Sequence, residues 1–388
     1  MAAIGKVIEG VLPPVGNPIS LNASEEIKPL FSGFKHVYVQ SGTAALALAL
    51  KLCSKSSKPG KSKVIIPAYA CPDLISAIVF AGLEPVLVDL FAGKSCFDLE
   101  SLVEEIDESV LAIIAVNFLG IREQIDVLRQ LPTVKLHDVT VIEDSAQWFP
   151  ENIALDQLAD MVCLSFGRGK PVSLLGGGLL LVRSSADIDV DVLIEEEISF
   201  FRRLIFSFKI VAYNLILQPF CYQLLARNPF IELGVTKYKQ LMAIKGFPSY
   251  LQRKLESNVE RYLSLSRHHE QLLAEGLTNQ RVRLLPENQN ARMLRFTLLF
   301  TDKQERDCAY EKLNTAGLGA TKLYEKPLNE FSDVQPFLSK NSMTKTYPNA
   351  KCLSEKMLTL PLHNGVSRKS VFKMLSILNQ LETNSCSS

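Results

Sequence analysis

Short apolar runs alternate with helical segments, such as Asp73–Ala81 and Arg122–Gln130, along the first half of the chain. This alternation is typical of a parallel sheet flanked by helices, so we predict an α/β fold. Strands of such a sheet are covered on both faces and therefore read as nearly continuous runs of Val, Ile and Leu. The predicted strands are Val64–Ile66, Pro85–Val88, Leu111–Val116, Val139–Ile142 and Met161–Phe166.

The second half of the chain has a different pattern, in which longer helical segments replace most of the apolar runs. A long amphipathic helix is predicted over Tyr250–Leu273, followed by a strand over Met293–Phe300. Two further helices are predicted over Gln304–Ala316 and Val371–Leu381. This change indicates a second, smaller unit of mixed α and β structure.

The segment Ile198–Gly234 separates the two halves and is strongly apolar. Its longest uncharged run, Ile210–Ala226, has 17 residues and contains Pro219, so it is at the lower limit of length for a membrane span. One interpretation is a helical hairpin buried at a dimer interface. The other is a surface that seats the protein on a membrane. Its members would be Phe200, Phe201, Leu204, Ile205 and Phe208 with Arg202, Arg203 and Lys209.

Composition agrees with a large soluble protein such as an enzyme. The 388 residues are 47% hydrophobic, which is enough for a substantial core in two domains. The 42 basic and 41 acidic residues give a net charge of +1, so we expect no nucleic-acid partner.

The cysteines and histidines lack the spacing of a metal site, and the eight cysteines include no CxxC pair. We therefore expect no metal and interpret the cysteines as free thiols in a reducing compartment. The first residues, MAAIGKVIEGVLPPVGNP, lack the long apolar core of a signal peptide, and we expect a cytoplasmic protein.

Lys170 is the first candidate for chemistry. It follows an apolar strand and precedes a glycine cluster in the segment Val162–Leu181, which reads VCLSFGRGKPVSLLGGGLLL. A lysine in a loop at a strand end is partly desolvated and can reach a carbonyl carbon, which is the setting that a covalent catalytic lysine needs. Taken alone, the residue also fits an ordinary surface lysine.

Two further segments favour the catalytic interpretation. The run VTVIEDSAQ places Asp144 at the C-terminal end of a strand, the edge of a parallel sheet where ligands bind. Upstream, Val37–Leu50 reads VYVQSGTAALALAL, a short strand, a turn and a helical run. Because a helix N-terminus presents free N–H groups to anions, Gly42, Thr43 and Ala44 form a candidate phosphate cradle.

The order of cradle, strand-end aspartate and lysine resembles the site of fold-type I pyridoxal phosphate enzymes. Ser165, five residues before Lys170, matches the SFxxxK block of the DegT/StrS family of sugar aminotransferases. Other blocks similar to that family cover roughly residues 35–185 and 290–380. They are SGTAAL at Ser41–Leu46, IIPAYACPDLISAIVFAGLEPVLVD at Ile65–Asp89, EDSAQ at Glu143–Gln147 and YPNAKCLSEKMLTLPLH at Tyr347–His363.

The resemblance implies the cofactor pyridoxal 5'-phosphate and a role for each matched residue. Lys170 would hold the cofactor covalently and carry a proton during the reaction. Asp144 would pair with the ring nitrogen and keep it protonated. Gln147 would reach the ring or its phenolic oxygen. Ser165 would bind the phosphate together with the amides of Gly42, Thr43 and Ala44.

Several positions depart from the family pattern. Cys71 occupies the place of an aromatic residue over the ring, so we expect either Cys71 or nearby Tyr69 to pack there. Gly167 and Gly176 replace a histidine and a glutamate. The family's GYNYR block is not recognisable, and IKGFPSYLQ at Ile244–Gln252 stands in its approximate place.

The family's fold has a large domain, with a mainly parallel seven-stranded sheet flanked by helices, and a smaller α+β C-terminal domain. We predict the large pyridoxal phosphate domain over 1–240, in which 198–234 is an atypical apolar helical insertion, and the small domain over 241–388.

The function implied is transfer of an amino group, from glutamate, to a keto sugar linked to a nucleotide, in polysaccharide or secondary-metabolite biosynthesis. The resemblance also implies a homodimer, and the segment 198–234 adds a candidate membrane contact. Two alternatives stay open. One is another pyridoxal phosphate reaction, a dehydration or a condensation, although the retained Lys170 argues against the dehydratase branch of the family. The other is a non-catalytic scaffold of the same fold.

Overall fold

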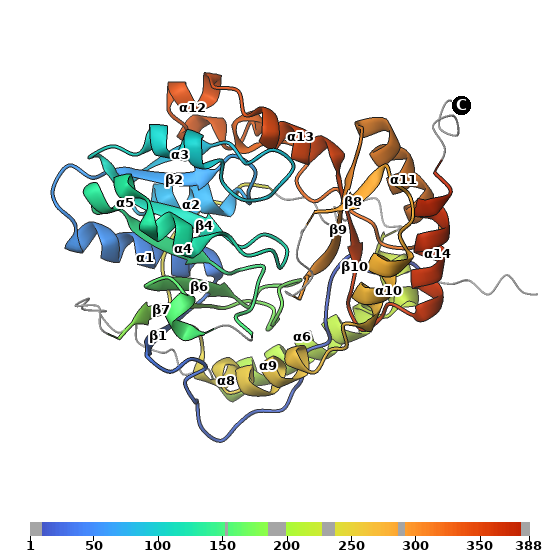
Figure 1. The fold of residues 1–388 in the computed structure, drawn as a ribbon. Helices are drawn as coiled ribbons and strands as arrows, with labels where there is room; N and C mark the ends of the chain where they lie inside the picture. Colours follow the sequence, from blue (N-terminus) through green and yellow to red (C-terminus); the bar gives the residue numbers. More distant parts are fainter. Residues whose placement is uncertain (1–9, 152–153, 185–198, 227–236, 286–291, 382–388) are drawn as a thin grey trace, which may run out of the picture.

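The computed structural model describes residues 10–151, 154–184, 199–226, 237–285 and 292–381. Its larger part is built on a seven-stranded sheet in the order β1-β7-β6-β5-β4-β2-β3, shown in Figure 1. Neighbouring strands from β3 to β6 run parallel, and β7 is antiparallel to both β6 and β1. The fold class predicted from the sequence is confirmed. The strands are β1 Phe34–Val39, β2 Lys63–Pro67, β3 Glu84–Val88, β4 Val110–Val116, β5 Thr140–Asp144, β6 Met161–Ser165 and β7 Gly178–Arg183.

Helices cover both faces of this sheet because successive strand residues point to opposite sides. Ile66 and Ile142 belong to the core that α1 and α2 cover, whereas Ile65 and Val141 belong to the core on the other face. All these side chains are buried, which explains the uninterrupted apolar runs. The helices are α1 Gly42–Ser56, α2 Asp73–Phe80, α3 Leu99–Glu105, α4 Ile125–Gln130 and α5 Pro132–Leu136, with a 3-10 turn η1 at Leu155–Gln157.

The C-terminal part has its own three-stranded antiparallel sheet and its own core. The strand order is β10-β9-β8, and the strands are β8 Val282–Leu284, β9 Arg295–Phe300 and β10 Met357–Pro361. Helices α10, α11 and α14 line one side of it in Figure 1. The helices and 3-10 turns here are α10 His268–Gly276, α11 Lys303–Thr315, η2 Leu328–Glu330, η3 Gln335–Phe337, α12 Lys340–Thr344, α13 Pro348–Lys356 and α14 Arg368–Asn379.

The single long helix predicted over Tyr250–Leu273 is wrong, because the chain forms α8 Ser249–Gln252, α9 Leu255–Leu263 and α10 instead. The guanidinium of Arg292 stabilises the break between α9 and α10. It donates hydrogen bonds to the carbonyls of Leu265 at 2.7 Å and Leu263 at 3.3 Å. It is also paired with Glu151 at 2.9 Å. A distant side chain therefore satisfies backbone groups that a continuous helix would have paired internally.

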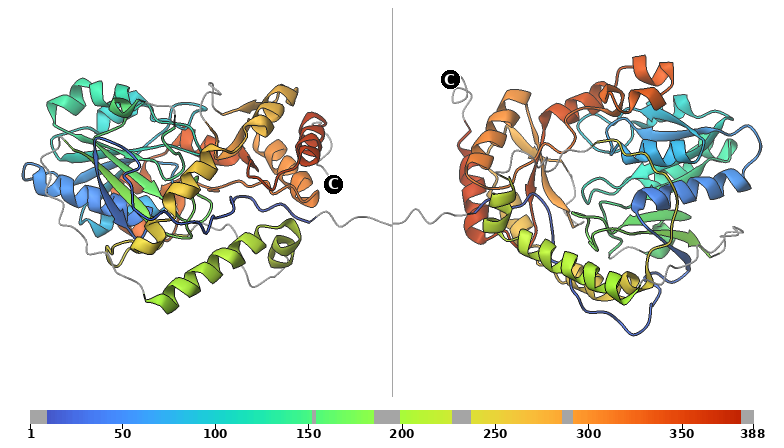
Figure 2. Two further views of the ribbon diagram at one scale, coloured as in Figure 1. Left: turned by 90° about the horizontal axis from the view of Figure 1, so that it is seen from below. Right: turned by 180° about the vertical axis from the view of Figure 1, so that it is seen from behind.

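The apolar segment forms two helices, α6 Phe200–Ile216 and α7 Pro219–Ala226. They meet at an angle of 91°, so the predicted helical hairpin is wrong for the described residues. Within the described ranges no single helix is long and apolar enough to cross a membrane, and this bent pair passes the test by length and composition only. In both views of Figure 2, α6 runs along the outer edge of the molecule.

The described N-terminal segment, residues 10–24, forms no helix or strand and lies against distant parts of the chain. The amide of Leu12 donates to the carbonyl of Gly317 at 2.9 Å, and that of Ser24 donates to Arg253 at 2.8 Å. Asn214 of α6 accepts from the amide of Ile19 at 2.8 Å and donates to its carbonyl at 2.9 Å. This segment therefore ties α6 and the C-terminal part together.

Six cysteines are free thiols in the described structure: Cys53, Cys71, Cys96, Cys163, Cys221 and Cys352. The structure has Cys308 in a disulfide, so the prediction that all the cysteines are free is wrong at this position. Sequence spacing did not indicate this bond because the distance between Cα atoms in the fold decides which cysteines can pair.

Candidate active site

A cavity of about 520 Å³, including its open mouth, lies at the edge where the parallel strands end. β4, β5 and β6 all contribute their last residues or the loops that follow, as expected for a ligand site in an open α/β sheet. The N-terminus of α1 opens at the same edge. The lining residues are Gly42, Thr43, Leu46, Ala70, Cys71, Asp73, Leu74, Val116, Asn117, Phe118, Asp144, Ala146, Gln147, Ser165, Lys170 and Tyr324.

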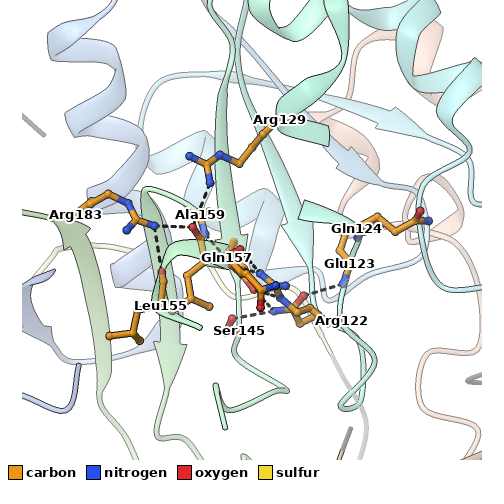
Figure 3. Close-up of polar contacts among 12 residues, drawn as sticks. Arg122, Glu123, Gln124, Arg129, Ser145, Leu155, Gln157, Ala159 and Arg183 are labelled. Atoms are coloured by element: carbon orange, nitrogen blue, oxygen red, sulfur yellow. Dashed lines mark hydrogen bonds and ion pairs between the residues drawn. The ribbon is translucent and has the colours of Figure 1, made fainter. Parts of the chain in front are cut away.

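The two adjacent carboxylates at the end of β5 have different surroundings. Glu143 is fully buried on one face and accepts hydrogen bonds from the Arg122 guanidinium at 3.0 Å, the Asn117 side chain at 2.9 Å and the Ala159 amide at 3.1 Å. Figure 3 shows Arg122 within this network beside Gln157 and Ala159. Since strand residues alternate in direction, Asp144 points to the opposite face and lines the cavity. The network around Glu143 thus fixes the strand end that presents Asp144.

Asp144 is only 4% exposed, and the amide of Ala146 donates to its Oδ1 at 3.0 Å. Burial raises the pKa of this carboxyl, an effect that the Ala146 amide and Lys170 oppose and nearby Asp73 reinforces. Burial of a carboxylate without a close cation costs free energy, and a cationic group in the cavity would recover it. The site therefore fits a protonated ring nitrogen beside Asp144.

Lys170 lies in the loop between β6 and β7 and lines the same cavity as Asp144 and Asp73. The preceding residue, Gly169, has φ of 73°, a conformation that favours glycine. A side-chain carbon at Gly169 would also lie 2.7 Å from Val15 of the N-terminal segment. Lys170 lines a second cavity as well, next to Val15. The N-terminal segment therefore packs against the loop that carries Lys170.

The candidate phosphate cradle lies where α1 begins, but its three predicted members differ. Gly42 and Thr43 line the cavity together with Ser165. A methyl group on Gly42 would lie 2.7 Å from Cβ of Ser165 and 3.0 Å from its Oγ, so only glycine permits this approach. The amide of Ala44 donates instead to the cap side chain of Ser41 at 3.1 Å. Gly42, Thr43 and Ser165 are therefore the members of the predicted cradle that line the cavity, whereas Ala44 is not among the lining residues.

The remaining predicted residues lie around Tyr324, a cavity residue that sequence reasoning missed. Gln147 donates to the Tyr324 hydroxyl at 3.0 Å and accepts from the amide of Leu119. Cys71 lines the cavity, and burial, followed by the charge of Asp73, raises the pKa of its thiol to about 12. Tyr69 is not among the lining residues, because its hydroxyl donates to the Tyr324 carbonyl at 2.8 Å and its ring packs on Phe118 and Tyr324.

Phe118, Tyr324 and Asp73 were not identified from the sequence. Phe118 and Tyr324 bring aromatic rings to the cavity that Cys71 also lines. Asp73 begins α2 and sits near Lys170, Thr43 and Cys71, and burial raises the pKa of its carboxyl. An acid in the first turn of a helix is common, so this position carried no signal of its own.

A family model described as the DegT/DnrJ/EryC1/StrS aminotransferase family matches residues 25–194 and 250–379. A UDP-N-acetyl-3-dehydro-α-D-glucosamine 3-aminotransferase of Acidithiobacillus ferrooxidans is 28% identical over 193 residues. That stretch is 49% of this chain and 50% of the relative, so the likeness spans about half of the relative's length.

Solved structures share the fold over a larger share of the chain. A protein described as a sugar aminotransferase from Streptococcus pneumoniae has a TM-score of 0.65 at 22% identity, covering 89% of this chain and 85% of that one. The same protein has been solved in forms with PLP and PMP. Helicobacter pylori PseC, an aminotransferase of pseudoaminic acid biosynthesis, has a TM-score of 0.65 at 15% identity, covering 88% and 85%. With most of its length matched by the family model, the chain belongs to the DegT/DnrJ/EryC1/StrS aminotransferase family.

Proposed function

We propose that this protein is a pyridoxal phosphate-dependent aminotransferase that transfers an amino group from glutamate to a nucleotide-linked keto sugar. The observation that carries the proposal is the convergence of Lys170, Asp144 and the cradle of Gly42, Thr43 and Ser165 on one cavity. The name of the Acidithiobacillus relative supports a keto sugar carried on a nucleotide as the amino acceptor. The product would serve polysaccharide or secondary-metabolite biosynthesis.

The residues around the cavity fit the cofactor, and each has a separate role in binding it or in catalysis. Pyridoxal phosphate, when bound, supplies an electron sink for the substrate carbon. The Nζ amine of Lys170 would hold the cofactor covalently and would serve as the proton carrier at the substrate carbon. The carboxylate of Asp144 holds a proton on the ring nitrogen because an anion favours the neighbouring cation. The amides of Gly42 and Thr43, at a helix N-terminus, orient the phosphate.

Tyr324 and Gln147 position groups on another side of the cavity. Because the Gln147 side chain bridges the Leu119 amide and the Tyr324 hydroxyl, both residues have a fixed orientation. Phe118 and Cys71 add apolar surface that excludes water, which strengthens the charge interactions of Lys170 and Asp144.

The alternatives from the sequence fit these observations less well. A scaffold of the same fold would gain nothing from a buried acid such as Asp144, whose burial costs free energy. A dehydratase of this family would lack the lysine that is present at position 170. A condensation would use the same residues, so the products of the reaction decide between it and amino transfer.

The proposed dimer is supported by the charges around the cavity. Lys170 is the one cation among the described lining residues, while Asp73 and Asp144 are acids. A phosphate group would thus lack a dedicated cationic partner in this chain, and we infer that a second copy supplies it across a homodimer interface. The cytoplasmic location and the membrane contact through 198–234 belong to the same proposal, and the exposed apolar side chains of α6 support the contact.

The proposal is tested by the absorption spectrum of the purified protein. We expect a visible band from the lysine-bound cofactor that disappears when glutamate is added, and amino sugar formation with nucleotide keto sugars. Lys170→Ala should lower turnover by roughly a thousandfold or more, because it removes both the covalent link and the proton carrier. The exposed Lys55→Ala is the matched control and should leave turnover unchanged.

Borohydride reduction followed by peptide mass mapping should label Lys170. A label at another lysine, or turnover that survives Lys170→Ala, would contradict the proposal. Formation of a new carbon–carbon bond or loss of a hydroxyl from the sugar would favour the alternative reactions.

A further inference from the structure

Helices α6 and α7 turn their apolar residues outward. Ile210 is the one buried residue of α6, whereas Phe200 is 82% exposed and Phe208 is 72% exposed. This pattern continues beyond the bend, since Phe220 and Leu224 of α7 are also exposed while Gln223 is buried. The outer apolar face comprises Phe200, Phe201, Leu204, Phe208, Val211, Leu215, Phe220 and Leu224.

Polar side chains of the same helices turn toward the protein and are hydrogen-bonded there. Asn214 exchanges two hydrogen bonds with the backbone of Ile19. The hydroxyl of Ser207 lies 2.6 Å from that of Tyr250. A surface helix of a globular protein normally has the reverse arrangement, with its apolar stripe toward the core. The outer apolar face is therefore built to be covered by an apolar medium or surface.

Two of the three positive charges of α6 lie beyond one edge of this face. Residues of a helix turn by about 100° per position, which places Phe200, Leu204, Phe208, Val211 and Leu215 in one arc. The exposed Phe201 and Ile205 extend that arc, and Lys209 and Arg202 follow them, whereas Arg203 lies on the protein side over the ring of Tyr250 at 5.8 Å. No Asp or Glu occurs among the described residues 199–226. Cations beside a broad aromatic and aliphatic face are typical of helices that lie in the interface of an anionic membrane.

We propose, as the finer form of the membrane contact in the proposed function, that α6 and α7 dock the enzyme onto an anionic lipid bilayer, with the outer apolar face among the acyl chains and Arg202 and Lys209 at the level of the headgroup phosphates. A second copy of this chain fits less well, because each copy would bring three cations and residues 199–226 of its partner would offer no acid opposite them. The family model supports a role outside the shared catalytic fold, since its match skips residues 195–249.

The test is flotation of the purified full-length protein with vesicles, measured without substrates. We expect the protein to float with vesicles of phosphatidylcholine containing about 30% phosphatidylglycerol, and less with phosphatidylcholine alone or in high salt. The double substitution Phe201→Ser with Phe208→Ser should lower the bound fraction roughly tenfold by removing apolar area. Leu136→Ser is the matched control, since Leu136 is 77% exposed on α5, and it should bind as the wild type does.

Two further measurements distinguish membrane binding from misfolding of the variant and from a contact between two copies of the chain. The Phe208→Trp variant should show an indole emission that shifts to the blue and is quenched by brominated lipids, over the background of the buried Trp148. Because these measurements need no cofactor or sugar, they hold or fail independently of amino transfer. Wild-type protein that stays out of anionic vesicles overturns the proposal. So does loss of a dimer on Phe201→Ser with Phe208→Ser, measured by light scattering without lipid.

Discussion

At the scale of single residues, Gly42 determines how closely α1 approaches the end of β6. Its missing side chain leaves room for Ser165, whose Cβ would lie 2.7 Å from an added methyl. We predict that Gly42→Ala displaces the Ser165 hydroxyl and weakens binding of pyridoxal phosphate roughly tenfold, or about 1.4 kcal/mol. Titration of the apoenzyme with the cofactor, followed by absorbance, measures this affinity.

Gly176→Ala provides the control because Gly176, in the loop between β6 and β7, lies near Gln40 just ahead of α1, yet the nearest atom to an added methyl is 3.9 Å away. The control should bind the cofactor as the wild type does. Equal affinities for all three proteins would show that the close approach of Gly42 to Ser165 has no part in binding.

Some residues of the cavity could be predicted and others could not. Asp144 and Lys170 could be predicted because Asp144 ends a recognisable strand and Lys170 lies in the loop after the next one, and such strand ends lie at the ligand edge of the sheet. From the sequence, Ala44 is equivalent to Gly42 and Thr43. In the structure its amide donates a hydrogen bond to the Ser41 side chain instead. Tyr324 gave no signal, since it lies outside regular structure, 177 positions beyond its partner Gln147.

At the scale of elements, the break between α9 and α10 depends on Arg292. Its guanidinium satisfies two helix-end carbonyls and pairs with Glu151, and both side chains are less than 15% exposed. We predict that Arg292→Met lowers the free energy of unfolding by about 2–3 kcal/mol, because it leaves Glu151 and the carbonyls unpaired. Urea unfolding of the apoenzyme measures the change.

Lys28→Met is suited as its control, since the Lys28–Glu256 pair is largely exposed. Exposed pairs contribute little, so this variant should lose less than about 1 kcal/mol. Similar losses in both variants would indicate that Arg292 acts only as a surface charge.

Element prediction succeeded where a run of sequence determines its own structure. The five apolar runs became β2 to β6 because burial on both faces of a parallel sheet selects such runs. It failed over Tyr250–Leu273, where the apolar period continues but Arg292, far along the chain, ends the helix. It failed also for the angle between α6 and α7, which composition does not encode.

At the scale of the whole molecule, His363 joins the N-terminal segment to the C-terminal part. Its Nε2 donates to the carbonyl of Pro13 at 2.8 Å, and its Nδ1 accepts from the amide of Gly365 at 3.0 Å. The second bond requires the neutral ring, because Nδ1 can accept a hydrogen bond only when it carries no proton. Burial lowers the pKa of His363 to about 4, with the Pro13 carbonyl opposing this and Arg295 adding to it.

The sign of the pH dependence follows from this lowered pKa. Between the unfolded value of about 6.5 and the folded value, the unfolded chain binds more protons than the native protein, so acidification favours unfolding. We predict that the free energy of unfolding falls by up to about 3 kcal/mol from pH 6.5 toward pH 4 on account of His363. Chemical denaturation at a series of pH values measures it. The His363→Gln variant should show a flatter profile, and an unchanged slope would exclude this residue as the cause.

The contact between Val15 and Gly169 has a practical consequence for anyone who handles this enzyme. Val15 lies against Gly169, next to Lys170, so a purification handle or fusion partner attached ahead of residue 10 would pull on the loop that carries Lys170. Tags and surface tethers therefore belong at the C-terminal end, since α14, which ends at Asn379, lies on the outside of the C-terminal part in Figure 1.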